Sequence, residues 1–178
     1  MKFESTYLND NILDALYDMR FDEMTPIQER CIPEILDYQD IIGVAQTGTG
    51  KTAAYLLPIL SMLDDGGYPK DAINCIIMSP TRELAQQIDQ AMQGFGYYLD
   101  SVSSVAVYGG NDGSRYDKEM KGLKLGADVI IATPGRLLSH IRMGNVDMSR
   151  VSFFVLDEAD RMLDMGFSDD IMQIASHL

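Results

Sequence analysis

The chain has 178 residues, of which 46% are hydrophobic and 23% charged, so it is long enough to bury one ordinary globular core. Its 14 basic and 27 acidic residues give a net charge of −13, which argues against the broad basic face of a sequence-blind nucleic-acid binder. No apolar run reaches membrane-spanning length, and no signal-peptide core follows Met1. Cys31 and Cys75 fit no metal or redox spacing, so we expect a reduced, cytoplasmic protein.

The first 38 residues predict helices. Asn9 or Asp10 can cap a helix whose apolar side chains recur at helical spacing. Thr25-Pro26 is typical of an N-cap followed by proline at the first helical position. Pro33 is expected to disturb that second helix.

A glycine-rich turn follows the apolar run 41–44, which we expect to be a strand, and precedes a helical pattern that starts at Ala53. Strand, glycine turn and helix together form the context of a phosphate-binding loop. Lys51 supplies a charge for the β- and γ-phosphates, and the Thr52 hydroxyl can ligate Mg²⁺. Ala45 stands where the strict pattern has glycine, and the alternative is a plain glycine turn with a surface lysine. We assign nucleotide binding here to Thr47, Gly48, Thr49, Gly50, Lys51, Thr52 and Ala53.

Farther along, continuous β-branched runs alternate with helical patterns. The expected strands cover 73–78, 104–107, 129–132 and 153–156, and the expected helices cover 82–97, 116–125, 136–143 and a segment starting at Ser168 or Asp169. This alternation predicts an α/β fold with a mostly parallel sheet covered on both faces. Ligands of such folds bind at the carboxyl ends of the strands, where each expected strand is followed by polar residues that can gather on one rim.

An acidic pair, Asp157-Glu158, comes directly after the last expected strand. A carboxylate at that place, in a chain with a phosphate loop, can hold Mg²⁺, which we assign to Asp157 together with Thr52. Glu158 is placed to take a proton from an attacking water. With Lys51, these residues form the expected catalytic set. The alternative is a pair of solvated loop acids.

The acidic pair continues as Asp157-Glu158-Ala159-Asp160, the motif that names the DEAD-box RNA helicases, and the chain resembles this family of ATP-dependent superfamily 2 enzymes from Phe3 to its end. The other family motifs appear in the family's order: Thr25–Gln28, Ala45–Thr52, Pro80–Ala85, Gly109-Gly110 and Thr133–Arg136. The resemblance implies one RecA-like lobe, a three-layer α/β P-loop domain over 1–178, with a helical adenine-recognition region at 1–38 and a core at 39–178.

The resemblance also implies an adenine pocket near the start of the chain. Phe21 resembles the aromatic that stacks on adenine, Gln28 the amide that pairs with its edge, and the Glu23 backbone a further contact. Phe3 stands where the family often has a supporting aromatic, and Arg20 replaces a usual glycine. Without the family, Gln28 is more simply a surface helix residue and Phe21 a core aromatic.

Three further motifs resemble the elements that grip one RNA strand along its sugar-phosphate backbone without reading sequence. Hydroxyls, turn N–H groups and helix N-termini are suitable phosphate ligands, so an acidic protein can hold RNA through a few placed donors. Considered singly, each motif is a helix cap or a tight turn. The implied RNA contacts are Pro80, Thr81, Arg82, Gly109, Gly110, Thr133, Pro134, Gly135 and Arg136.

Two parts of the family's catalytic core are absent from this sequence. One is a strand ending in Ser-Ala-Thr, which in related folds lies between the phosphate-loop strand and the acidic-motif strand; the other is the second RecA-like lobe with its arginines. We therefore expect this chain to bind ATP and Mg²⁺, to hydrolyse ATP slowly, and not to unwind RNA alone. The rival interpretations are a non-hydrolysing nucleotide-binding or partner-docking module, and another P-loop enzyme such as a small-molecule kinase or a DNA helicase. No pattern indicates an oligomeric state.

Overall fold

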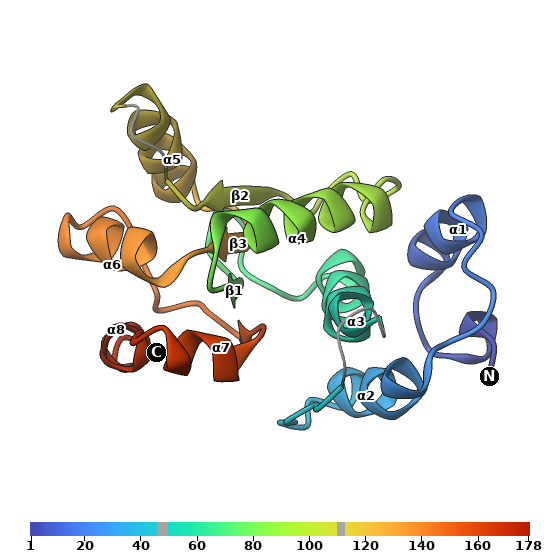
Figure 1. Cartoon of the computed structure of the whole chain (residues 1–178). Coiled ribbons are helices and arrows are strands. Elements are labelled where there is room, and N and C mark those ends of the chain that lie inside the picture. Colours follow the sequence, from blue (N-terminus) through green and yellow to red (C-terminus); the bar gives the residue numbers. More distant parts are fainter. Residues whose placement is uncertain (46–49, 110–112) are drawn as a thin grey trace. The chain divides into compact units, whose positions relative to one another are not determined.

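A computed structural model of the chain describes residues 1–45, 50–109 and 113–178. These residues form two compact units, one made of Met1–Gly67 with Gln90–Val102 and the other of Tyr68–Asp89 with Ser103–Leu178. The helix α4 (Arg82–Phe95) contributes residues to both units. Figure 1 labels the helices and strands along the chain.

The first unit is helical. It contains the short 3-10 helix η1 (Phe3–Ser5) and the helices α1 (Asp10–Asp18), α2 (Pro26–Leu36) and α3 (Lys51–Asp65). Both α1 and α2 pack against α3. Its enclosed apolar side chains include Ile12, Leu16, Ile32, Leu56, Leu57 and Leu60.

The predicted helix starts are confirmed. Asn9 caps α1, and its side chain accepts a hydrogen bond from the Ile12 N–H. Thr25 is the N-cap of α2, with Pro26 at the first helical position. Pro33 lies inside α2 but does not end it, and the helix continues through Leu36.

The second unit is built on a parallel sheet. In the described residues the sheet has four strands in the order β2-β3-β1-β4, with bounds Ser104–Val107, Val129–Ala132, Cys75–Met78 and Phe153–Leu156. The register aligns Met78 with both Ala132 and Leu156, so the strands end together at one edge. The central strands β1 and β3 are buried throughout, whereas the edge strand β4 is only partly covered. This confirms the predicted α/β class and its parallel sheet.

One face of this sheet carries the apolar core of the unit. Alternate residues of the two central strands (Ile76, Met78, Ile130 and Ala132) belong to it. Against them pack side chains from four helices, α5 (Gly113–Leu125), α6 (Pro134–Arg142), α7 (Ala159–Asp164) and α8 (Ser168–Ala175). In Figure 1, α6 and α8 lie beside one another, as their mutual packing requires.

One expected strand is not formed. Residues 41–44 have no strand conformation, and the side chains of Ile42 and Val44 are 95% and 89% exposed. A strand needs a hydrogen-bonded neighbour, and none of the four described strands pairs with this segment.

In the described ranges, no helix is long and apolar enough to cross a bilayer.

Candidate functional site

The helix α3, which follows the predicted phosphate loop, starts behind a glycine whose backbone and surroundings both disfavour a side chain. Gly50 is the N-cap residue and has a left-handed backbone with φ 83°. A Cβ at this position would overlap the side-chain nitrogen of Gln28 and lie 3.1 Å from Thr25 Oγ1. The start of α2 therefore packs directly against the start of α3.

The first turn of α3 holds the described part of the predicted nucleotide site. Lys51 and Thr52 are half-buried and Ala53 is buried. N–H groups in the first turn of a helix lack intrahelical partners, and the helix dipole adds positive potential, so this turn suits an anion. The predicted nucleotide contacts Thr47, Gly48 and Thr49 lie outside the described residues.

Gln28 is buried, not exposed on its helix. Only 2% of its surface is accessible. Its Oε1 accepts a hydrogen bond of 2.9 Å from Thr25 N, and its Nε2 donates one of 3.2 Å to Gly50 O. The reading as a surface helix residue is therefore wrong. The amide ties the start of α2 to Gly50, the N-cap of α3, and each of its two polar atoms keeps one further hydrogen-bonding position.

Phe21 belongs to an aromatic cluster with one open side. Its ring meets Phe95 edge-on at 5.8 Å between centroids and lies 6.5 Å from the ring of Phe3. Phe3 is 2% exposed, whereas Phe21 is 39% exposed. The exposed part of the Phe21 ring is available to a flat ligand such as a base. Glu23, beside it, is exposed and its backbone forms a bridge with Lys2.

The backbone at Arg20 has a conformation that glycine adopts more easily than other residues. Its backbone φ is 61°, in the left-handed region that a side chain disfavours. The substitution of Arg for Gly thus keeps the turn but stores about 1 kcal/mol of strain, next to the predicted adenine-stacking ring.

The acidic motif begins at the carboxyl edge of the sheet, as predicted. Asp157 N donates a hydrogen bond of 2.9 Å to Met78 O, which fixes the first carboxylate at the end of β4. Asp157 is half-buried. Oxygen ligands on a fixed backbone suit Mg²⁺. Lys51 and Thr52 belong to the first unit and Asp157 to the second.

Glu158 has a strained backbone and an oxygen without a hydrogen bond. Its φ of 55° is left-handed, and α7 starts directly after it. Its Oε2 forms an ion pair with Arg161 Nη1 at 3.6 Å; it is buried and has no hydrogen-bond partner among the described residues. Such strain is typical of functional sites, and an unsatisfied carboxylate oxygen can accept a proton.

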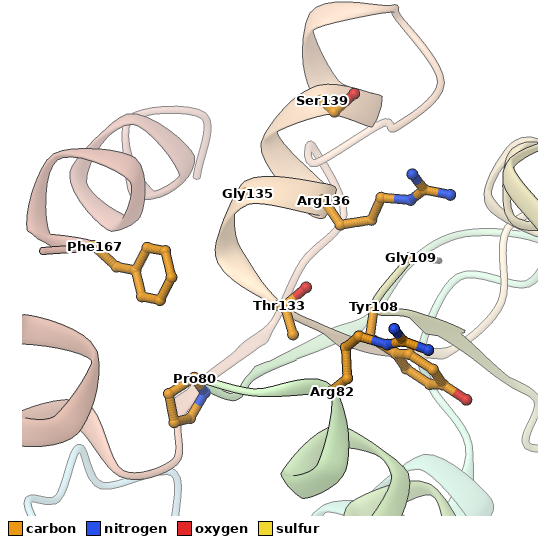
Figure 2. A pocket seen from close by; sticks show the side chains of 9 residues that line it. All are labelled: Pro80, Arg82, Tyr108, Gly109, Thr133, Gly135, Arg136, Ser139 and Phe167. Carbon is orange, nitrogen blue, oxygen red and sulfur yellow. The ribbon is translucent and has the colours of Figure 1, made fainter. Parts of the chain in front are cut away.

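A pocket of about 490 Å³ in the second unit gathers most of the predicted RNA contacts. Figure 2 shows its lining side chains, which come from the ends of different strands and the starts of different helices. Of the predicted residues, it contains Pro80, Arg82, Gly109, Thr133, Gly135 and Arg136. Thr81 and Pro134 are their chain neighbours, and Gly110 lies outside the described residues.

The starts of α4 and α6 supply donors near this pocket. Thr81 Oγ1 caps α4 by accepting a hydrogen bond of 3.2 Å from Leu84 N. Thr133 is the N-cap of α6, but its hydroxyl makes no capping bond. Gly135, in the first turn of α6, is exposed, and a Cβ built on it would meet nothing within 4 Å. The helix start is therefore open to a ligand such as a phosphate.

Arg136 and Gly109 share one side of the pocket. Gly109 has φ 77°, and a Cβ there would lie 3.3 Å from Arg136 Nε. The Gly109 N–H donates a hydrogen bond of 3.2 Å to Glu119 Oε2, so this turn contributes its shape to the pocket and not that N–H. Arg136 Nε donates a bond of 2.7 Å to Glu119 Oε1.

Three further pocket residues were not found from the sequence. Tyr108 stacks beneath the guanidinium of Arg115 at 4.1 Å, Ser139 follows Arg136 by one helical turn, and Phe167 precedes α8. Ser139 carried a detectable signal, because residues three apart on a helix share one face. Tyr108 and Phe167 lie just outside the recognised motifs.

Comparison with known proteins gives a consistent result. A family model described as DEAD/DEAH box helicase matches residues 25–178. The chain is 43% identical, over 99% of its length, to an ATP-dependent RNA helicase DeaD of Klebsiella pneumoniae and to one of Escherichia coli K12, covering 27% and 28% of them. It is 41% identical, over 98% of its length, to the Mycobacterium tuberculosis H37Rv protein of that name, covering 30% of it. The chain thus spans less than a third of the length of these relatives.

Proposed function

Because the chain belongs to the DEAD/DEAH box helicase family, we propose that it is the ATP-binding RecA-like lobe of an ATP-dependent RNA helicase. When paired with a second RecA-like lobe, it remodels or unwinds RNA duplexes. Alone, it binds nucleotide and does not unwind. One observation carries the RNA part of this proposal: six of the nine predicted RNA contacts line a single pocket.

In this proposal the first unit binds the nucleotide. The start of α3 receives the phosphates, with Lys51 placed for the β- and γ-phosphates and Thr52 for the metal. The open side of Phe21 stacks on adenine, and the remaining donor and acceptor of Gln28 pair with the base edge. Since Gln28 also bonds Gly50, the base site and the phosphate site share one side chain.

The acidic motif performs the chemistry. Asp157 joins Thr52 as a protein ligand of Mg²⁺, which would neutralise charge that develops on the phosphates. Mg²⁺ usually keeps several waters and binds substrate phosphates beside one or two protein ligands. Glu158 accepts a proton from the attacking water through its unsatisfied carboxylate oxygen.

The second unit holds RNA by its backbone. Two helix starts, the Thr133 hydroxyl and the Arg136 guanidinium face one pocket, and these groups recognise phosphate and ribose without reading bases. Such placed donors explain how a chain of net charge −13 can bind a polyanion. The free thiols of Cys31 and Cys75 support a reducing compartment, and we assign the cytoplasm.

Nucleotide titrations test the ATP-binding part. The chain should bind a fluorescent ATP analogue, and Lys51→Ala should weaken binding by about ten- to a hundredfold, the equivalent of one lost charge-assisted contact. Lys70→Ala removes the same charge from an exposed site and serves as the matched control. Equal affinities of the two variants would refute the assignment of Lys51 and favour a glycine turn with a surface lysine.

A further inference from the structure

Glu119 is a buried charge in a chain with many exposed acids. It lies inside α5 and is 3% exposed, and among the described residues it is the only buried Asp or Glu. A carboxylate is removed from water at a large free-energy cost unless its oxygens are well paired. Its partners therefore indicate why it is there.

The carboxylate joins segments that are separate in the sequence. Its Oε1 accepts hydrogen bonds from Arg136 Nε at 2.7 Å and from His140 Nε2 at 2.9 Å, both on α6. Its Oε2 accepts one from the Gly109 N–H at 3.2 Å, at the end of β2, and lies 3.6 Å from Arg115 Nε. Both oxygens are thus occupied, and two predicted RNA contacts are tied to one side chain.

His140 bonds the Glu119 carboxylate and is itself fixed by neighbouring side chains. Its Nε2 must carry the proton that Glu119 accepts, so its Nδ1 accepts the hydrogen bond of 3.1 Å from Asn145 Nδ2. The ring is fully enclosed and stacks on Tyr116 at 4.2 Å with an interplanar angle of 12°. Asn145 Nδ2 also reaches the Tyr116 hydroxyl at 3.3 Å. Neither Glu119 nor His140 can rotate without breaking these contacts.

The same contacts leave one terminal nitrogen of Arg136 without a hydrogen bond. Glu119 uses its Nε, and its guanidinium lies 4.9 Å from the ring of Tyr116. Its Nη2, by contrast, is buried and has no hydrogen-bond partner in the part of the chain that the structure describes, although the side chain as a whole is 20% exposed. Figure 2 shows Arg136 at the pocket, on the side of Gly109. A guanidinium held at Nε is oriented to donate with its terminal nitrogens to a phosphate.

We propose that Glu119 is a positioning residue for RNA binding: it contacts no RNA, but its buried carboxylate holds the Arg136 guanidinium and the Gly109 turn in the geometry that the RNA backbone meets. This inference rests on the proposed RNA binding at the pocket. His140, Asn145 and Tyr116 fix the carboxylate in turn.

The sign of the effect separates this role from simple electrostatics. Glu119 is an anion beside a proposed phosphate site, so removing its charge should strengthen RNA binding by Coulomb attraction alone. Under the proposal, removing the charge weakens RNA binding, because Arg136 and the Gly109 turn lose their fixed geometry.

The test measures affinity for a fluorescein-labelled oligouridine by anisotropy. Glu119→Gln keeps the shape of the side chain, and Asp117→Asn makes the same charge change at an exposed position of α5. We expect E119Q to weaken RNA binding about fivefold to tenfold and D117N to leave it unchanged or slightly tighter. Affinity for the ATP analogue should be unchanged in both, which a general loss of folding would not allow.

The double variant tests the connection to Arg136. We expect Arg136→Ala to weaken RNA binding about tenfold and to lower the salt dependence by about one phosphate contact. E119Q should then add little in the R136A background, because coupled residues are not additive. Equal or tighter binding by E119Q, or a fully additive double variant, would overturn the inference. Full RNA affinity of R136A would instead refute the proposed RNA site itself.

A second variant decides the question if E119Q does not fold. Arg136→Lys changes a side chain that is 20% exposed and keeps its charge. A lysine cannot bond Glu119 through one edge and phosphate through another, so R136K should bind RNA nearly as weakly as R136A. Recovery of wild-type affinity in R136K would mean that Arg136 acts as a point charge, and Glu119 would have no positioning role.

Discussion

Replacing Gly135 by alanine should stabilise the protein and weaken its RNA binding. Gly135 lies in the first turn of α6 and lines the proposed RNA pocket. Nothing in the protein lies within 4 Å of an added Cβ, so the variant folds without a clash. The methyl group instead occupies the space through which a phosphate approaches the helix start.

Both magnitudes follow from this geometry. Alanine is favoured over glycine within a helix by about 0.5–1 kcal/mol, which sets the expected gain in the free energy of unfolding. Displacing a phosphate from the helix N–H groups removes about one charge-assisted hydrogen bond, worth about 1.5–3 kcal/mol or roughly ten- to a hundredfold in affinity.

Gly113→Ala is the matched control. Gly113 is also in the first turn of a helix, α5, and also has open space around an added Cβ, but it lies outside the pocket. Urea denaturation should show similar gains for both variants, whereas oligouridine anisotropy should show a loss only for G135A. Equal RNA affinities of the two variants would refute the idea that RNA approaches the start of α6.

The remaining predictions concern stability and base selection. Gly126 has φ 82°, and a Cβ added there would lie 2.7 Å from the backbone nitrogen of Ala72. Gly144 has a similar φ of 74° but open space around it, so Gly144→Ala should lower the free energy of unfolding by roughly 1 kcal/mol. Urea denaturation should show a clearly larger loss for Gly126→Ala. Equal losses would contradict the close packing at Gly126. Burial raises the pKa of the Cys75 thiol from its ordinary 9.0, so its contribution to stability is complete below pH 9 and declines at higher pH, where the unfolded chain ionises first. Cys75→Ala should flatten the loss of stability above pH 9, and an unchanged slope would contradict this. Gln28→Ala should abolish the preference for ATP over GTP in competition titrations and lower stability by about 1–3 kcal/mol, since two partly buried backbone groups lose their partner. A retained preference would exclude Gln28 from base recognition.

The strands were predictable because their signal is local. The strands at 104–107, 129–132 and 153–156 have the predicted bounds, since each is a short, mostly apolar run bounded by polar or turn residues. The run 41–44 (Ile-Ile-Gly-Val) is also mostly apolar and β-branched but forms no strand. The residue types in a segment indicate only whether it favours a strand conformation. Whether the strand forms depends on a neighbouring strand, which is distant in the sequence.

The sequence predicted helix starts correctly where strong capping residues mark them, and missed them elsewhere. Asn9 and Thr25-Pro26 are strong capping signals and were predicted correctly. The helix α5 begins at Gly113, three residues before the predicted start. The prediction missed this first turn because glycine and serine usually indicate a loop. The six-residue α7 has too few turns to show a helical period.

The polar network of the second unit was not predictable. Glu119 is surrounded in the sequence by lysines and resembles one charge of a solvated helix face. His140 has no ligand or catalytic partner at a useful spacing in the sequence, and in the structure it is fully buried with both ring nitrogens bonded. Pairing between Glu119, Arg136 and Gly109 depends on how β2, α5 and α6 meet, and no local spacing encodes that arrangement.

RNA-stimulated ATP hydrolysis tests the central claim most directly. The 178-residue chain should bind ATP but release phosphate very slowly, with or without single-stranded RNA. A protein extended through a second RecA-like lobe should hydrolyse ATP faster when RNA is added, and Glu158→Gln should abolish that turnover. Rapid RNA-stimulated hydrolysis by the 178-residue chain alone, or none by the extended protein, would contradict the account.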